Sequence, residues 1–237
     1  MTYNQNPYFT ALLPVHLTTA HNLVIIYCLE LVTTMETKKF TQDVKEKGEK
    51  DESKVSDKLL KTRTILLSGE VTAVSARKVM EQLLVLEAED ANKPITLIIN
   101  SPGGDVHSGF AIFDLIRFIK PEVRIVCAGL TASIATVILL AAKKTCRFSL
   151  PNARFLLHQP MFQTEVFGPA SDLEITANEI LKTKDRINRL IALETGQPIE
   201  KVERDTQRDF WLSADEAKDY GLVSEIITNR DEIPSQK

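Results

Sequence analysis

Short apolar runs alternate with segments of helical periodicity along the chain from Thr64 onward. Five of these runs have the length of a β-strand: residues 64–67, 95–99, 123–127, 148–150 and 155–157. The second run is apolar at almost every position, which is typical of a strand buried on both faces of a sheet. This alternation of strands and helices predicts an α/β fold.

Several helical segments lie between or after these strands. Ser75 is expected to cap a helix that follows the first strand. The third strand should end at Gly129, and residues 133–144 then form an unusually apolar helix, which is too short to span a bilayer and should be buried. Residues 173–193 form a long helix that ends at Gly196. Its apolar positions fall on one stripe: Leu173, Ala177, Ile180, Ile187 and Ile191.

The N-terminal part of the chain does not continue this pattern. An apolar run at residues 23–32 contains Glu30 and is half as long as the roughly 20 residues that a membrane-spanning helix needs. No Lys or Arg precedes Lys38, so the basic start of a signal peptide and the Arg-rich face of a transit peptide are both missing. The mixed charges of residues 38–58 are typical of a solvated linker.

We therefore expect three parts: a poorly ordered extension and linker of residues 1–56, a folded domain of residues 57–230, and a short tail of residues 231–237. Residues 1–34 contain no basic side chain and are followed by Met35. Met35 is accordingly expected to be the true start of the protein, or the preceding segment to be dispensable for folding.

Charge and cysteine content narrow the class of protein. The net charge of -3 argues against a nucleic-acid-binding face, which is usually basic. The three cysteines are odd in number and show no CxxC spacing, which favours a reduced, cytoplasmic compartment over a disulfide framework. Cys127 and Cys146 lie in apolar runs and are expected in the core. The four histidines are spaced too widely for a recognisable metal site, so no metal or other cofactor is expected.

Ser133 is a candidate nucleophile, because it lies where a strand and the small-residue turn Gly129-Leu-Thr-Ala-Ser run into a helix. At a helix N-terminus the backbone N–H groups and the dipole favour developing negative charge. The N–H of Ile134 could then serve an oxyanion. The alternative is that Ser133 is simply an N-cap.

Three further positions could complete such a site. Two adjacent glycines, Gly103 and Gly104, follow the second strand and could expose N–H donors, although a plain strand-to-helix turn is the alternative. His158 ends an apolar strand and could be a general base or a hydrogen-bonded core residue. Asp209 could orient the histidine, but Asp205 competes with it for that role, and a solvated carboxylate is the default for both. A serine nucleophile needs such a base and acid, and its oxyanion needs two donors.

At these residues the chain resembles ClpP, the peptidase subunit family of ATP-dependent Clp proteases. The likeness covers about residues 57–230 in order and rests on six motifs: Ile99-Asn-Ser-Pro-Gly-Gly, Gly129-Leu-Thr-Ala-Ser-Ile, Leu157-His-Gln-Pro, Glu179-Ile-Leu-Lys, Glu203-Arg-Asp-Thr-Gln-Arg-Asp and Leu212-Ser-Ala-Asp-Glu-Ala-Lys-Asp-Tyr-Gly-Leu. The resemblance implies a serine endopeptidase that cuts unfolded polypeptides. It also implies a triad of Ser133, His158 and Asp209, with oxyanion donors at the backbone N–H groups of Gly104 and Ile134.

The resemblance further implies a crotonase-like fold of ββα repeats and rings of seven subunits stacked in pairs. Residues 173–193 correspond to the protruding handle helix that joins the two rings. A Clp-family ATPase would feed substrate chains into the chamber. No metal or nucleotide is implied for peptide cleavage itself, and neither a nucleic acid nor a membrane is implied as a partner.

The chain departs from the family pattern at several places. Gln207 replaces an acidic residue that often forms an ion pair between rings, and the loop at residues 161–171 looks two residues longer than usual. Thr96 and Ile98 stand where aromatic residues often line the ATPase-docking groove. These departures leave open a mainly structural subunit of a mixed ring. A crotonase-type acyl-CoA enzyme is a second alternative, because such enzymes also use paired backbone donors for an oxyanion. The retained triad argues against both.

Overall fold

The computed structural model describes residues 55–161 and 167–234, which from Ser56 onward belong to one unit of the chain. The expectations for the extension of residues 1–54, including a start at Met35, lie outside the described residues. Within the described part of the chain, no helix is both long enough and apolar enough to cross a membrane.

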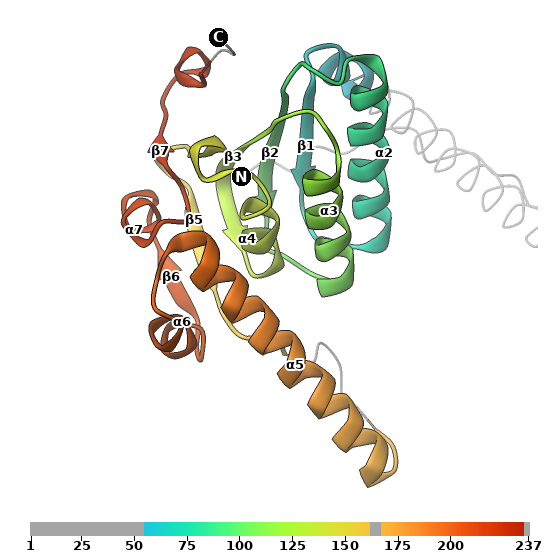
Figure 1. The fold of residues 1–237 in the computed structure, drawn as a ribbon, viewed down its shortest axis with the longest axis vertical. Helices are drawn as coiled ribbons and strands as arrows, with labels where there is room; N and C mark the ends of the chain where they lie inside the picture. The colour runs from blue at the N-terminus through green and yellow to red at the C-terminus, as the bar shows by residue number, and fades with distance from the viewer. Residues whose placement is uncertain (1–54, 162–166, 235–237) are drawn as a thin grey trace, which may run out of the picture. The chain divides into compact units, whose positions relative to one another are not determined.

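A mostly parallel sheet of seven strands forms the centre of this unit (Figure 1). The main path runs in the order β1-β2-β3-β4-β7, while β5 pairs with β3 and carries β6 at its other edge. All neighbouring strands are parallel except β5 and β6, which are antiparallel. The strands are β1 (Thr64–Ser68), β2 (Ile95–Ser101), β3 (Val123–Ala132), β4 (Arg147–Ser149), β5 (Arg154–Leu157), β6 (Phe210–Leu212) and β7 (Glu225–Ile226).

Helices α2, α3 and α4 pack over one face of the sheet and bury the main core beneath them (Figure 1). Residues 55–61 are helical and precede β1. Among the later helices, α5 and α6 lie between β5 and β6 in sequence, and α7 lies between β6 and β7. The bounds of the helices are α2 (Ala73–Glu89), α3 (Val106–Phe118), α4 (Ile134–Leu139), η1 (Lys144–Cys146), α5 (Ala170–Thr195), α6 (Ile199–Asp205), α7 (Ala214–Tyr220) and η2 (Arg230–Glu232). The predicted α/β fold class is confirmed.

The prediction that β2 is buried on both faces is wrong. Ile95, Leu97 and Ile99 are fully buried, but Thr96 and Ile98 between them are half-buried. The physical reason is that the three helices cover a single face of the sheet. The opposite face is covered in part by the C-terminal segment, where Ile227 packs in a small cluster on β3 and β4.

Three predicted boundaries are also corrected. Helix α2 is capped by Thr72, whose side chain accepts from the Ser75 N–H, so Ser75 completes a capping box three residues inside the helix. Helix α4 has six residues and not the twelve positions of 133–144: it ends at Leu139, and the 3₁₀ turn η1 begins only at Lys144.

Strand β3 does not end at Gly129 but continues to Ala132. Gly129 has φ 66°, and a Cβ there would lie 2.7 Å from the side-chain oxygen of Asn100. That same oxygen accepts from the Leu130 N–H at 3.1 Å. The resulting irregularity shifts the register with β2 and lets the last residues of β3 pair with β5.

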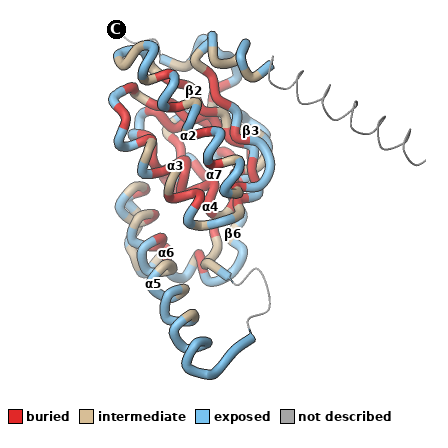
Figure 2. Tube along the Cα trace, turned by 90° about the vertical axis from the view of Figure 1, so that its right-hand side faces the viewer, coloured by how far each residue is buried: buried red, intermediate tan, exposed pale blue. Residues whose placement is uncertain are grey.

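Helix α5 is the longest helix described, with 26 residues, and its N-terminal part projects away from the sheet (Figure 1). Only the C-terminal part of its apolar stripe, at Ile187 and Ile191, is buried; Leu173 is 38% exposed and Ile180 is half-buried. Figure 2 shows the same change from buried to exposed along the helix. The predicted protruding helix is therefore present, but half of its apolar stripe has no partner within the described residues.

Candidate active site

Ser133, His158 and Asp209 line one cleft of about 570 Å³, together with Gly104. They come from distant parts of the sequence and from three elements. Ser133 follows β3, His158 follows β5, and Asp209 precedes β6. Ile134 lines a smaller adjoining cavity that also contacts Ser133 and His158. The fold thus brings all five predicted site residues together at the ends of neighbouring strands, where sites form in sheets of this kind.

The backbone of Ser133 has an uncommon conformation, with φ 55° and ψ -126°. Such a conformation costs on the order of 1–3 kcal/mol in a non-glycine residue, and persists only when surrounding contacts hold it. Here the Ser133 N–H donates to the Leu156 carbonyl at 2.9 Å, and the Ser133 carbonyl accepts from the Thr136 N–H at 3.0 Å. The Ser133 side chain makes no capping hydrogen bond, so the N-cap alternative is wrong.

The two predicted oxyanion donors lie on adjacent backbone segments. A Cβ built on Gly103 would lie 2.7 Å from the Ser133 Cβ and 3.2 Å from the Ile134 nitrogen. At Gly104, where φ is 147°, a Cβ would lie 2.3 Å from the Val71 carbonyl oxygen. Only glycine lets this loop approach the serine and the loop after β1 so closely. Among the described residues, neither the Gly104 nor the Ile134 N–H has a hydrogen-bond acceptor.

His158 and Asp209 face each other, with the histidine Nδ1 3.9 Å from the Asp209 Oδ1. That distance exceeds hydrogen-bond length, so the imidazole is close to the carboxylate but not yet oriented by it. The His158 side chain is 14% exposed and that of Asp209 is 63% exposed. Gln159 ties the two segments together, because its N–H donates to the Thr206 carbonyl at 2.7 Å and its side-chain amide to the Gln207 carbonyl at 3.0 Å.

The structure separates Asp209 from its competitor. The Asp205 carboxylate accepts from Lys201 Nζ at 2.8 Å and from the Tyr220 hydroxyl at 3.0 Å, outside the cleft. Burial raises the pKa of Tyr220, and the bond to Asp205 raises it further, which keeps this phenol a donor. Asp205 is therefore occupied in a structural cluster, and Asp209 is the acid available to His158.

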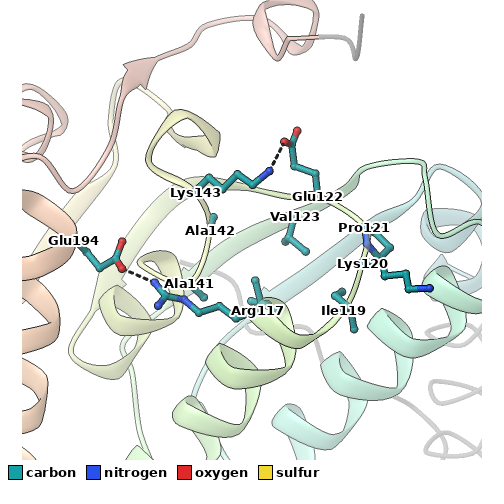
Figure 3. Close-up of a pocket in the computed structure, with 11 residues that line it drawn as sticks. Arg117, Ile119, Lys120, Pro121, Glu122, Val123, Ala141, Ala142, Lys143 and Glu194 are labelled. Atoms are coloured by element: carbon teal, nitrogen blue, oxygen red, sulfur yellow. Dashed lines mark hydrogen bonds and ion pairs between the residues drawn. The ribbon is translucent and has the colours of Figure 1, made fainter.

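Two features outside the cleft, the buried cysteines and a second cavity, offer no comparable chemistry among the described residues. Cys127 and Cys146 are buried as expected, and burial raises the pKa of both thiols. A second cavity, of about 390 Å³, lies beside the Arg117–Glu194 and Lys143–Glu122 ion pairs and contains no nucleophile (Figure 3). Within the described ranges, no group of three or more His, Cys, Asp or Glu side chains is placed to hold a metal ion.

Two acidic residues that line the cleft, Glu70 and Asp105, are not among the site residues predicted from the sequence. Glu70 follows β1 just as Asp105 follows β2. The sequence did contain a signal for them, because each lies in a loop that follows an apolar run. The carboxyl ends of parallel strands meet at one edge of a sheet, so both loops could have been expected near the site.

Comparison with known proteins agrees with this geometry. The family model described as Clp protease matches residues 46–230. The chain belongs to the Clp protease family. It is 47% identical over 196 residues to the ATP-dependent Clp protease proteolytic subunit 2 of Treponema pallidum (strain Nichols), covering 83% of this chain and 98% of that protein. It is 46% identical over 196 residues to the protein of the same name from Treponema denticola, covering 97% of that protein.

Family membership confirms the predicted resemblance and the predicted enzyme class, a serine peptidase. The family also implies a Clp ATPase as partner and assembly into rings. The crotonase-type alternative has no support in these comparisons.

Proposed function

We propose that this protein is the proteolytic subunit of an ATP-dependent Clp protease, with Ser133 as nucleophile, His158 as base and Asp209 as the acid that orients His158. The observation that carries the proposal is the strained backbone of Ser133, which combines with His158 and a glycine loop in one cleft. Strain of this kind is held at nucleophilic serines on sharp strand-to-helix turns. A merely structural serine has no need of it.

In the proposed reaction, His158 takes the hydroxyl proton of Ser133 as the oxygen attacks a peptide carbonyl. The negative charge that forms on the carbonyl oxygen accepts hydrogen bonds from the N–H groups of Gly104 and Ile134. His158 then donates its proton to the leaving amine, and water releases the acyl group by the same steps in reverse. The small cavity beside Ser133 is lined mainly by apolar residues, including Val106, Val137 and Ile187, and its volume of about 20 Å³ is too small for a substrate side chain.

The proposed substrates are unfolded polypeptides, delivered by a Clp-family ATPase in the cytoplasm. The proposed assembly is a pair of stacked rings of seven subunits, formed by this chain alone or with a second ClpP-like subunit. Support for the ring contact comes from α5, whose N-terminal part projects beyond the sheet (Figure 1) and which exposes the apolar side chains of Leu173, Ile175 and Leu181. Several exposed apolar side chains on one projecting helix are typical of a contact with another protein surface.

The test is labelling with a serine-reactive phosphonate, followed by peptide mapping and a fluorogenic peptide assay. We expect one adduct, on Ser133, and loss of both labelling and hydrolysis in Ser133→Ala. The matched control is Ser68→Ala, an exposed serine outside the cleft, which should keep both. An adduct on another residue, or full activity of Ser133→Ala, would contradict the proposed nucleophile. A folded protein that is neither labelled nor active with its ATPase would favour the structural-subunit alternative.

A further inference from the structure

Two carboxylates from separate loops lie next to the proposed oxyanion donor. The Val71 N–H donates to the Gly103 carbonyl at 2.7 Å, and the Val71 carbonyl accepts from the Asp105 N–H at 2.8 Å. These two bonds hold the loop after β1 against the loop after β2. As a result, the Cγ of Glu70 lies 3.0 Å from the position that a Cβ on Gly104 would take.

Both residues line the cleft and are exposed to solvent, and the Asp105 carboxylate is also held in place by a hydrogen bond. Asp105 is the N-cap of α3, where its Oδ1 accepts from the Ser108 N–H at 2.8 Å. Hydrogen bonds from Ser108 hold the pKa of Asp105 below its usual value, so this group is charged at neutral pH. The salt bridges of the described residues include no partner for Glu70 or Asp105.

The charge of the cleft is uneven. Its described lining residues include no Lys or Arg, and His158 is the one basic side chain among them. Arg208 lines a neighbouring hollow that shares His158 and Asp209 with the cleft. Glu70 and Asp105 line the cleft beside Gly104 and do not line that hollow, whereas Arg208 lines the hollow and not the cleft.

We propose that Glu70 and Asp105 form an acidic subsite that selects basic side chains of the substrate on the Gly104 side of the scissile bond and disfavours acidic ones. This inference rests on the proposed function, because it takes Gly104 as the donor to the substrate carbonyl. A lysine or arginine at the first or second residue from that carbonyl falls within about 7 Å along the extended chain, which is within reach of both carboxylates.

The same geometry predicts an effect on turnover as well as on binding. A carboxylate beside the oxyanion site opposes the negative charge that forms there. A basic substrate side chain would neutralise Glu70 at that moment, so basic substrates should gain in kcat and not only in KM. An acidic side chain would add to the repulsion. Glu70 and Asp105 thus act as specificity-determining residues and not as members of the triad.

The experiment compares matched fluorogenic peptides in which one position at a time, on either side of the cleaved bond, carries Lys, Gln or Glu. Exposed charge pairs are each worth up to roughly fivefold, and attraction of Lys adds to repulsion of Glu. We therefore expect kcat/KM to be about tenfold higher for Lys than for Glu at low salt, on one side of the bond only. About 0.5 M salt should reduce this ratio to less than about twofold.

The decisive variant is Glu70→Gln combined with Asp105→Asn. Asparagine caps a helix about as well as aspartate, so α3 should be retained. The Lys-to-Glu ratio should fall to less than about twofold, while hydrolysis of the Gln peptides continues. The matched control is Glu89→Gln, which removes one negative charge at the far end of α2, about 24 Å along the helix from Ala73. It should keep the tenfold ratio.

Equal cleavage of Lys and Glu peptides by the wild-type protein, or an unchanged ratio in the double variant, would overturn the inference and leave the proposed function intact. If no peptide is cleaved, the proposed function fails. The inference is then decided by fluorescence anisotropy of the same labelled peptides with Ser133→Ala. Tighter binding of the Lys peptides that is lost with Glu70→Gln and Asp105→Asn supports it, and equal binding overturns it.

Discussion

Replacing Glu194 with alanine is expected to destabilise the protein strongly, because it removes the counter-ion of a buried arginine. The Arg147 side chain is 1% exposed and pairs with the Glu194 carboxylate, which is 17% exposed. Arg117 donates to the other carboxylate oxygen at 2.5 Å (Figure 3). The three side chains fasten the C-terminal end of α5 to α3 and β4.

The expected loss is about 3 kcal/mol. Removing one partner of a buried ion pair costs about 3–5 kcal/mol, because the remaining charge stays buried without compensation. The lower end applies here, since Arg147 keeps hydrogen bonds to the Ala142 carbonyl at 2.8 Å and to the Leu140 carbonyl at 3.0 Å. For a unit of this size, such a loss lowers Tm by about 6–12 °C. Glu194→Gln retains an acceptor and should lose about half as much.

The contribution of Glu194 should also depend on pH. Burial alone would raise its pKa, but hydrogen bonds from Arg117 and Arg147 outweigh burial and hold the pKa below the usual value of 4.5. A lowered carboxyl pKa adds stability above the unfolded-state value, and this stability is lost as pH falls through the folded-state value. The Tm difference between wild type and Glu194→Gln should be constant above about pH 5.5 and shrink at lower pH.

Thermal unfolding of the two variants, at one protein concentration because rings form, tests both expectations. The matched control is Glu89→Ala, which removes an exposed glutamate with no ion-pair partner within the described residues. A loss below about 1 kcal/mol in Glu194→Ala, or a Tm difference that grows as the pH falls, would refute the reasoning.

Three further outcomes are expected. Asp209→Asn should lower peptidase turnover by about 10⁴-fold, whereas Asp205→Asn should keep turnover and lower Tm, because Asp205 bonds Lys201 and Tyr220. Equal turnover losses in the two variants would argue against Asp209 as the orienting acid. Cys127 should resist iodoacetamide at pH 8 until the protein unfolds, because burial raises its pKa to about 12; mass mapping of a native adduct there would contradict its burial. The purified chain alone should favour single rings or inactive double rings, because the neutral Gln207 forms a weaker contact between rings than a carboxylate would. Analytical ultracentrifugation that finds a stable, fully active double ring would show that Gln207 does not matter.

The sequence by itself determined the local elements and singled out the residues that we predict to react. Apolar runs located β1 to β5, and the amphipathic period located α5, because both patterns depend on neighbouring residues alone. The glycine pair and the serine turn also led to the predictions of an oxyanion loop and of a nucleophile, which the labelling experiment on Ser133 tests. Family membership supports the peptidase class that these residues predict.

Tertiary structure decided what depends on contacts between distant residues. The left-handed backbone of Ser133 is held by the Leu156 carbonyl, and the pairing of Asp205 with Lys201 and Tyr220 leaves Asp209 to face His158. Helices on a single face of the sheet leave one side of β2 half-exposed, which its apolar sequence could not reveal. Glu70 joins the cleft because Val71 bonds a loop more than thirty residues away. Periodicity records the burial of each segment, whereas hydrogen bonds between loops determine which side chains share a site.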